Sequence, residues 1–239
     1  RFSDDGVSYS NRWVQTSKLS QEDEVEENIF INVGDMKGAV GLAKMSLFKL
    51  RSKVGLIDDT HGTGRANTAL LNHGGKLLAL HEADAPYELS LSEDASVQTL
   101  GRQDFDGKLD FPFTAHPKVD PRTGELLFFG YQIDKKPYCK LGFVNAQGEW
   151  VKSFPVDFDE PRMMHDCAIT ENYMIIIGTS IIFNPEEMVK QNSLPFTVDS
   201  EKPMLFGMVP RDAKSQDEIT WFEMPAGTVF HTVNAWENG

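Results

Sequence analysis

The feature that most constrains the fold is a repeated alternation of short apolar runs and turn signals from Gly64 onward. The first pair of runs, in TALLNHGGKLLAL, flanks Asn72 to Gly75, and later pairs flank turns such as Asp120 to Gly124 and Asn145 to Gly148. Runs of roughly five to eight residues joined by tight turns are typical of antiparallel strands. The sequence therefore predicts an all-β domain built from hairpins, and a sandwich, a barrel and a propeller all satisfy this pattern.

Three histidines discriminate among these architectures. His116, His165 and His231 each lie on or beside a short apolar run, and gaps of 49 and 66 residues separate them. A propeller blade takes roughly 40 to 50 residues, and the polar stretch from Pro185 to Lys202 lengthens the second gap. Because equivalent strands of successive blades face one axis, this spacing predicts that the three imidazoles of a propeller converge.

Converging imidazoles point to a metal. Neutral nitrogen ligands suit iron, copper, nickel and zinc, whereas a closed structural zinc site usually includes cysteines at short spacing. The two cysteines, Cys139 and Cys167, form no such pair and are expected to be buried thiols. The sequence contains no GxSxG motif, so it gives no indication of a serine nucleophile.

Glu82, in LLALHEADAPY, lies at the end of a predicted strand about one blade before His116. We expect this acid to hydrogen-bond a ligand imidazole, and the alternative is a surface carboxylate at a strand end. His81 and Glu82 would point to opposite faces if the strand continued. His61 and His73 fall in predicted turns and are expected to be solvated.

Net charge excludes one class of partner. The formal charge is −13 and no basic stripe with interleaved aromatic residues occurs, which argues against nucleic acid. No apolar run approaches the roughly 18 residues of a membrane span.

The segment Met36 to Ile57 is the exception to the β pattern. It contains no acid, its lysines and arginine make it basic, and its apolar residues recur at helical spacing at Val40, Ala43, Leu47, Leu50 and Val54. Two interpretations stay open: a helix packed over the β-domain, or a basic amphipathic insertion that faces a membrane surface.

Several motifs together resemble one family. FTAHPKVDPRTGE, RMMHDCAITENY and VFHTVNAWE, with HGTGRANTAL, LLALHEADAPY and GRQDFDGKL, are similar to the carotenoid cleavage oxygenase family in order and in their gaps. The resemblance implies a seven-bladed β-propeller that holds non-haem iron(II) on its axis through four histidines, some of them hydrogen-bonded to glutamates.

Carried over by motif, the iron ligands are His116 in AHPK, His165 in MMHD and His231 in FHTVNAWE, and Glu82 corresponds to one of the glutamates. The fourth histidine is expected beyond Gly239. Residues 1–239 are therefore expected to form part of a single propeller domain.

The activity that the resemblance implies is that of an oxidoreductase inserting both atoms of dioxygen across a conjugated double bond. A carotenoid or apocarotenoid would give two carbonyl products, in the cytosol or in a plastid, with peripheral contact to a membrane. Tyr87 and Phe113 are candidates for a substrate tunnel, but core packing is the expected duty of both.

Three alternatives stay open. A stilbenoid-cleaving dioxygenase would share the fold and the iron, although some of the family's stilbenoid cleavers carry a lysine where this chain has His81. A trans-to-cis isomerohydrolase is a related possibility. A non-catalytic propeller that serves as an interaction scaffold is the rival from a different class.

Overall fold

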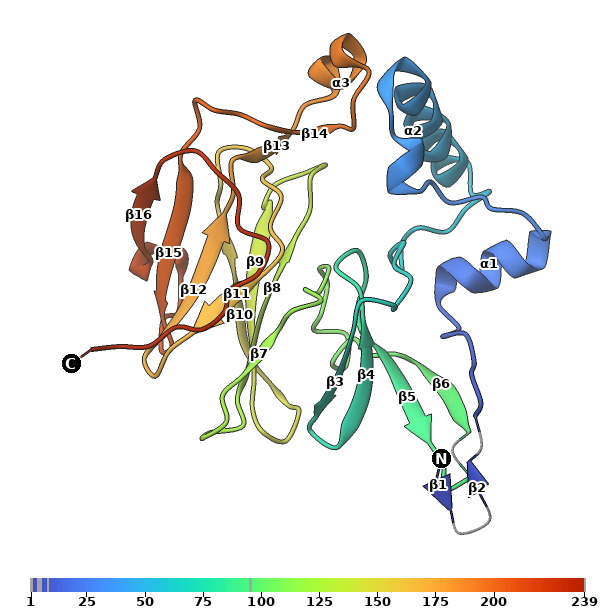
Figure 1. Cartoon of the computed structure of the whole chain (residues 1–239), viewed down its shortest axis with the longest axis horizontal. Helices are drawn as coiled ribbons and strands as arrows, with labels where there is room; N and C mark the ends of the chain where they lie inside the picture. Colours follow the sequence, from blue (N-terminus) through green and yellow to red (C-terminus); the bar gives the residue numbers. More distant parts are fainter. Residues whose placement is uncertain (1, 4–5, 8, 95, 239) are drawn as a thin grey trace.

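The computed structural model describes residues 2–3, 6–7, 9–94 and 96–238, and most of its regular structure is β-strand. Three four-stranded antiparallel sheets follow one another along the chain (Figure 1). Two two-stranded sheets, three α-helices and two short 3-10 helices complete the regular structure of the described residues. The expected β-rich fold is confirmed, with more helix than the single segment that the sequence predicted.

The first sheet is a meander of four consecutive strands: β3 (Ala69–His73), β4 (Lys76–Leu80), β5 (Tyr87–Leu91) and β6 (Val97–Arg102). Gly74 and Gly75 alone join β3 to β4, with φ of 56° and 76°, a region that residues with a Cβ rarely adopt. Asn72 and His73 therefore belong to β3 and not to the turn. The connection between β5 and β6 includes Ala95, which lies outside the described residues.

The second sheet repeats this meander with β7 (Lys118–Val119), β8 (Leu126–Tyr131), β9 (Cys139–Val144) and β10 (Trp150–Val156). The third sheet has the order β11 (Cys167–Ile169), β12 (Tyr173–Gly178), β15 (Met204–Pro210) and β16 (Thr220–Met224). Between β12 and β15 the chain leaves this sheet to form β13 (Ile181–Phe183), α3 (Pro185–Gln191) and β14 (Phe196–Val198). This excursion contains the polar stretch that lengthens the second histidine gap.

Strand β8 explains how the sheets pack. Leu126 and Phe128 belong to an apolar cluster shared with the first sheet, whereas Leu127 and Phe129 belong to a cluster shared with the third. Successive side chains of a strand point to opposite faces, so the continuous apolar run LLFF fills two cores at once. Full burial of each such side chain stabilises the packing by about 1.5 to 3 kcal/mol. The second sheet is thereby held between its two neighbours.

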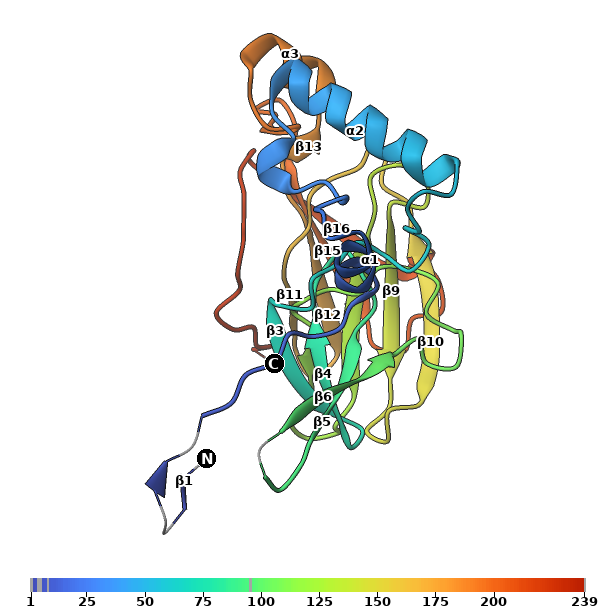
Figure 2. The ribbon, with the colours of Figure 1, turned by 90° about the vertical axis from the view of Figure 1, so that its right-hand side faces the viewer.

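The helices lie outside the sheets. Helix α1 (Ser17–Val25) begins at Thr16, whose Oγ1 accepts the backbone N–H of Leu19 at 3.1 Å. Helix α2 (Gly38–Lys53) contacts α3, and the two lie together at one end of the sheets (Figures 1 and 2). The remaining elements are η1 (Val33–Asp35), η2 (Gln216–Glu218) and the hairpin of β1 (Phe2–Ser3) and β2 (Gly6–Val7). Among the described residues, no helix has both the length and the apolar character that crossing a bilayer requires.

Helix α2 presents its predicted apolar stripe to solvent. Val40 is 69% exposed, Leu47 is 47% exposed and Leu50 is 56% exposed. The packed side of the helix instead carries Gly41, which is buried, and Phe48, which is half-buried. Of the two interpretations left open, a helix packed over the β-domain would have to use the residues that the stripe omits, because the stripe itself is exposed.

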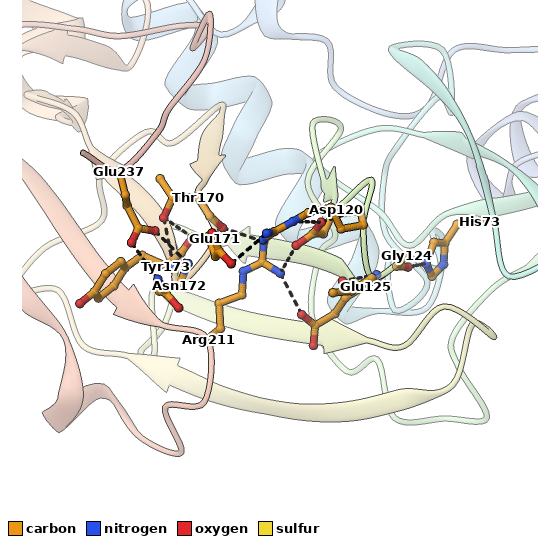
Figure 3. Close-up of polar contacts among 12 residues, drawn as sticks. His73, Asp120, Gly124, Glu125, Thr170, Glu171, Asn172, Tyr173, Arg211 and Glu237 are labelled. Atoms are coloured by element: carbon orange, nitrogen blue, oxygen red, sulfur yellow. Dashed lines mark hydrogen bonds and ion pairs between the residues drawn. The ribbon is translucent and has the colours of Figure 1, made fainter. Parts of the chain in front are cut away.

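A polar cluster joins turns of the second and third sheets (Figure 3). Arg211, which directly follows β15, forms ion pairs with Asp120 at 2.8 Å and Glu125 at 3.0 Å, both from the connection between β7 and β8. It also donates to the carbonyl oxygen of Thr170, between β11 and β12, at 2.8 Å. One guanidinium thus links two sheets through their turns.

His73 extends these links to the first sheet. Its Nε2 lies 2.9 Å from the carbonyl oxygen of Gly124, in the connection between β7 and β8 (Figure 3). A carbonyl oxygen only accepts, so His73 donates its Nε2 proton. The prediction that His73 is solvated is wrong: the residue is buried, because its turn packs against the next sheet.

The chain after β16 also departs from the sequence-based expectation. The run TVFHTVNAW predicted a strand, but residues 225–238 have no regular secondary structure. Gly227 and Ser180 are joined by two hydrogen bonds of 3.0 Å each, which attach the start of this segment to the connection between β12 and β13. A strand needs a neighbour for its backbone groups, and none pairs with this segment among the described residues.

Candidate metal centre

His116 directly precedes Pro117 and β7, the first strand of the second sheet. Its backbone N–H donates to Oγ1 of the buried Thr114 at 3.0 Å, and the Thr114 hydroxyl lies 3.4 Å from the carbonyl oxygen of His165. The backbone N–H of Thr114 donates to the carbonyl oxygen of Phe129 in β8 at 2.8 Å. Thr114 thereby ties the backbone of His116 to its own sheet and to the segment of His165.

Gly130 allows this close approach. A Cβ at this position of β8 would lie 1.6 Å from the carbonyl oxygen of Pro112, far inside van der Waals contact. Any larger residue would push the segment that carries His116 away from β8. The glycine in LLFFGY is therefore explained by the placement of the histidine.

His165 precedes β11, the first strand of the third sheet, as His116 precedes β7 in the second. Its Nδ1 lies 2.9 Å from Oε2 of Glu82, which follows β4 of the first sheet. A carboxylate only accepts, so His165 donates from Nδ1, and in the tautomer of a neutral imidazole that carries its proton there, Nε2 is the nitrogen that can bind a metal. The structure thus places Glu82 against a candidate ligand imidazole, as expected, and shows that this imidazole is the one of His165.

Strand β4 ends at Leu80, so the expected alternation of His81 and Glu82 across a strand does not apply. His81 Nδ1 instead accepts the backbone N–H of Ala83 at 3.1 Å, within a turn. This turn after β4 places the Glu82 side chain against His165.

His231 lies in the irregular segment 225–238, with its side chain 61% exposed. Its ring centroid lies 4.8 Å from that of His116 and 5.0 Å from that of His165, whose own centroids are 4.6 Å apart. One ligand atom from each ring can be chosen so that all three lie within 4.8 Å of one another. The predicted convergence of the three imidazoles is present in the structure.

These residues fit a divalent transition metal. The Nε2 atoms of His116 and His165 are 3.1 Å apart. Two nitrogens bound to one metal at about 2.0 to 2.1 Å, at right or tetrahedral angles, are separated by roughly 3 Å. An all-nitrogen donor set of this kind suits iron, copper, nickel or zinc.

The surroundings of His116 and Glu82 change the pKa values of both side chains. Burial, followed by the nearby His165, lowers the pKa of His116, which keeps this imidazole neutral. Burial raises the pKa of Glu82, and the contact with His165 opposes that change. The hydrogen bond with Glu82 occupies Nδ1 of His165 and leaves Nε2 on the side of the other two histidines.

Asp166 is a buried residue that the sequence analysis did not single out. Its carboxylate contacts Lys118 Nζ at 2.7 Å and accepts the backbone N–H groups of Cys167 and Thr232, each at 2.8 Å. Burial would raise the pKa of Asp166, but these hydrogen bonds outweigh it, so the pKa lies below its usual value. The sequence offered one indication of this contact, because Lys118 lies in the AHPK motif and Asp166 lies in the MMHD motif, each within two residues of a candidate ligand.

Other candidates have structural roles. Tyr87 is buried, and its hydroxyl accepts from the backbone N–H of Ser17 at 2.9 Å. Phe113 is fully buried and stacks on Phe128 with ring centroids 4.2 Å apart. Core packing is confirmed for both aromatic residues.

The remaining thiol and histidine predictions are confirmed. Cys139 and Cys167 are buried and free, and burial raises the pKa of Cys167 to about 12. His61 is exposed in a turn.

Antiparallel sheets with three convergent histidines define a β-protein with a candidate all-nitrogen metal centre. The profile of the family described as retinal pigment epithelial membrane protein matches residues 1–239. The chain therefore belongs to this family, and its resemblance to the carotenoid cleavage oxygenases is confirmed.

Two curated relatives illustrate the similarity. The carotenoid 9,10(9',10')-cleavage dioxygenase 1 of Phaseolus vulgaris is 45% identical over 237 residues, covering 99% of this chain and 44% of the relative. A chloroplastic 9-cis-epoxycarotenoid dioxygenase of Arabidopsis thaliana is 36% identical over 235 residues, covering 98% of this chain and 41% of the relative. The chain thus spans less than half the length of the curated relatives it matches.

A solved structure agrees in fold. The cobalt-substituted apocarotenoid oxygenase of Synechocystis superposes with a TM-score of 0.71 and 27% identity, over 95% of this chain and 46% of that chain. The family is metal-dependent, in accord with the three histidines of this structure.

Proposed function

We propose that this chain is part of a non-haem iron(II) dioxygenase that cleaves a conjugated C=C bond of a carotenoid or apocarotenoid. The observation that carries the proposal is the convergence of His116, His165 and His231, with Glu82 against His165. The 45% identity to a carotenoid cleavage dioxygenase supports the substrate class. A fourth histidine is expected beyond Gly239.

The side chains of this chain have distinct duties in the proposal. His116, His165 and His231 would hold the iron through neutral imidazoles, and Glu82 keeps the proton of His165 on Nδ1. When bound, iron(II) supplies the one-electron chemistry that lets dioxygen react with an organic double bond. One C=C bond breaks and each of its carbons gains one oxygen atom, so dioxygen is consumed without an external reductant.

We further propose that the three sheets are blades of a seven-bladed β-propeller, with residues 1–239 forming part of one domain. Each sheet is a four-stranded antiparallel unit, which is the usual propeller blade. His116 and His165 occupy equivalent positions before the first strands of successive sheets, as radial repetition requires.

Contact with a membrane surface is proposed for residues 36–57. The apolar stripe on α2 is exposed, and the segment carries five cationic residues and no acid. Such a surface suits the boundary of a bilayer in which a polyene dissolves. A plastid location is proposed with it, because relatives of this chain are chloroplastic.

The proposal is tested in the full-length protein that contains this chain. We expect iron in stoichiometric amount and two carbonyl products, each with one oxygen-18 atom when labelled dioxygen is supplied. His116→Ala, His165→Ala and His231→Ala should each lose most of the iron and all cleavage while keeping their circular dichroism spectra. The exposed His61 provides the control, His61→Ala, which should retain both.

The outcomes separate the alternatives. A variant with wild-type iron content removes that histidine from the ligand set. A wild-type protein without metal or cleavage supports an interaction scaffold. Preferred cleavage of a stilbenoid, or a single isomerised alcohol as product, supports the corresponding enzyme of the same fold.

A further inference from the structure

One buried carboxylate contacts all three segments that carry the candidate ligands. Asp166 directly follows His165, and its side chain is only 2% exposed. Its Oδ1 lies 2.7 Å from Nζ of Lys118, which is two residues after His116. The positive charge of Lys118 offsets the buried carboxylate, and charge-assisted hydrogen bonds of this kind are short and strong.

The other carboxylate oxygen holds the segment of His231. Oδ2 of Asp166 accepts the backbone N–H of Thr232 at 2.8 Å and lies 3.0 Å from the Thr232 hydroxyl. That hydroxyl also lies 2.9 Å from the carbonyl oxygen of Cys167. Thr232 directly follows His231, so these contacts are made one residue from the candidate ligand.

Among the described residues, these are the hydrogen bonds nearest to His231 along the chain; on its other side, Phe230 makes a ring contact with His165 at a centroid distance of 5.2 Å. Residues 225–238 have no regular secondary structure, and the His231 side chain is too exposed for packing to fix it. The flanking hydrogen bonds, Gly227 with Ser180 and Glu237 with Asn172, lie four and six residues away along the chain. Thr232 and the carboxylate that holds it therefore form the hydrogen-bonded anchor closest to His231.

We infer that Asp166 is a positioning residue that presents His231 to the metal by holding Thr232, while its contact with Lys118 ties the same carboxylate to the segment of His116. This inference rests on the proposed metal centre. Asp166 is not itself a ligand in this arrangement, because both of its oxygens already accept hydrogen bonds from other donors. His231 Nδ1 lies 3.8 Å from Oδ2, too far for a direct hydrogen bond.

The first measurement needs no metal. Amide hydrogen exchange is followed in the metal-free full-length protein for the wild type, Asp166→Asn and Thr232→Val. We expect residues 228–236 to exchange faster in Asp166→Asn, and to a smaller degree in Thr232→Val, which keeps the backbone N–H. The control is Asp110→Asn, which removes a carboxylate that pairs with Lys140 on the surface and should leave this segment unchanged.

The second measurement uses cobalt(II) alone as the probe. We expect the cobalt affinity of Asp166→Asn to fall by roughly 10 to 100-fold, the usual effect of losing a residue that supports a ligand. The absorption spectrum of the bound cobalt should also change, because the spectrum reports how many ligands are present. Thr232→Ser keeps the hydroxyl that Thr232→Val removes. Its cobalt affinity should therefore lie closer to that of the wild type than the affinity of Thr232→Val does.

Different results separate this inference from the proposed function. If the wild type binds cobalt and Asp166→Asn binds it equally, with the same spectrum and unchanged exchange, the positioning role is overturned. If the wild type binds neither iron nor cobalt, the proposed metal centre itself fails, and the role of Asp166 toward it fails with it. Should Asp166→Asn not fold, Thr232→Val decides by the same two measurements.

Discussion

An imidazole binds a metal only through an unprotonated nitrogen, and the partner of its other nitrogen decides which one that is. For His165 the partner is Glu82, whose Oε2 lies 2.9 Å from Nδ1. Glu82 follows a strand of the first sheet and His165 precedes a strand of the third. The contact therefore forms only when these two sheets are packed in the observed arrangement. A ligand nitrogen is thus prepared by a residue 83 positions away in sequence.

Replacing this acid should weaken the metal site without removing it. In Glu82→Gln the amide oxygen can still accept from Nδ1, but the negative charge that strengthens this hydrogen bond is lost. We expect iron affinity or cleavage rate to fall by roughly 10 to 100-fold. The control is Glu88→Gln, which removes a surface partner of Lys76. Unchanged affinity and rate in Glu82→Gln would make Glu82 an ordinary surface acid.

At the scale of elements, the sheets are joined by polar contacts between their turns as well as by apolar packing. The pair of Arg211 and Asp120 is largely buried, with side chains 13% and 3% exposed. Removing one partner of a buried pair leaves the other charge without compensation. By contrast, Arg122 and Glu171 form a pair whose side chains are 56% and 65% exposed.

We therefore expect Arg211→Ala to lower the free energy of unfolding of the full-length protein by roughly 3 kcal/mol or more. The matched variant Arg122→Ala should cost less than about 1 kcal/mol, because exposed ion pairs contribute little. Urea unfolding measures both. Equal losses in the two variants would show that the buried guanidinium does not join the sheets.

The same pair predicts a pH dependence. Burial would raise the pKa of Asp120, but the N–H of Arg122 and the charge of Arg211 outweigh it and hold the pKa below its usual value. A carboxyl group whose pKa is lower in the folded state stabilises that state above the unfolded pKa and loses this contribution as the pH falls through the folded pKa. The stability difference between wild type and Asp120→Asn should stay constant from neutral pH to about pH 5 and shrink below about pH 4. A difference that widens with acid would contradict this.

Helix α2 provides the other prediction at this scale. Replacing Leu47 and Leu50 with serine removes two exposed leucines, each of which would gain about 1.5 to 3 kcal/mol on full burial in a bilayer. Liposome binding and activity on a carotenoid in vesicles should fall by roughly tenfold or more, whereas activity on a detergent-dispersed substrate should remain. Leu91 and Leu100, exposed on β5 and β6, provide the control double variant. Equal losses in both assays would instead indicate that α2 supports the fold.

At the scale of the whole molecule, the third sheet has an uncovered outer strand. Every residue of β16 is exposed, including Trp221 at 37%, Phe222 at 54% and Met224 at 50%. An exposed edge strand with large apolar side chains readily pairs with other chains. In a propeller, neighbouring blades cover such surfaces.

We expect residues 1–239, expressed alone, to be poorly soluble or loosely folded and inactive. Size-exclusion chromatography and hydrogen exchange report the state of the chain, and metal analysis with a cleavage assay reports its function. A soluble monomer that holds one equivalent of iron and cleaves a polyene would overturn this expectation. It would then require a fourth ligand from within the chain, with His61, His73 and His81 as the candidates.

The sequence by itself determined the strands and the candidate ligands. Strands such as β8 are visible because alternation and turn residues are local properties, readable over a few neighbouring positions. His116, His165 and His231 were found by their spacing and by the motifs around them. The same local information correctly indicated a helix within 36–57, although not which side of it packs.

Only the tertiary structure decided which distant groups meet. The contact of Glu82 with His165, the buried position of His73 and the hold of Asp166 on Thr232 all join residues from different sheets or segments. Such contacts depend on how the sheets stack, and no local pattern encodes a partner 50 to 80 residues away. The segment of His231 shows the limit most clearly: its alternating sequence predicted a strand, but no strand pairs with it among the described residues, and it is held by contacts with distant groups, among them the buried carboxylate of Asp166.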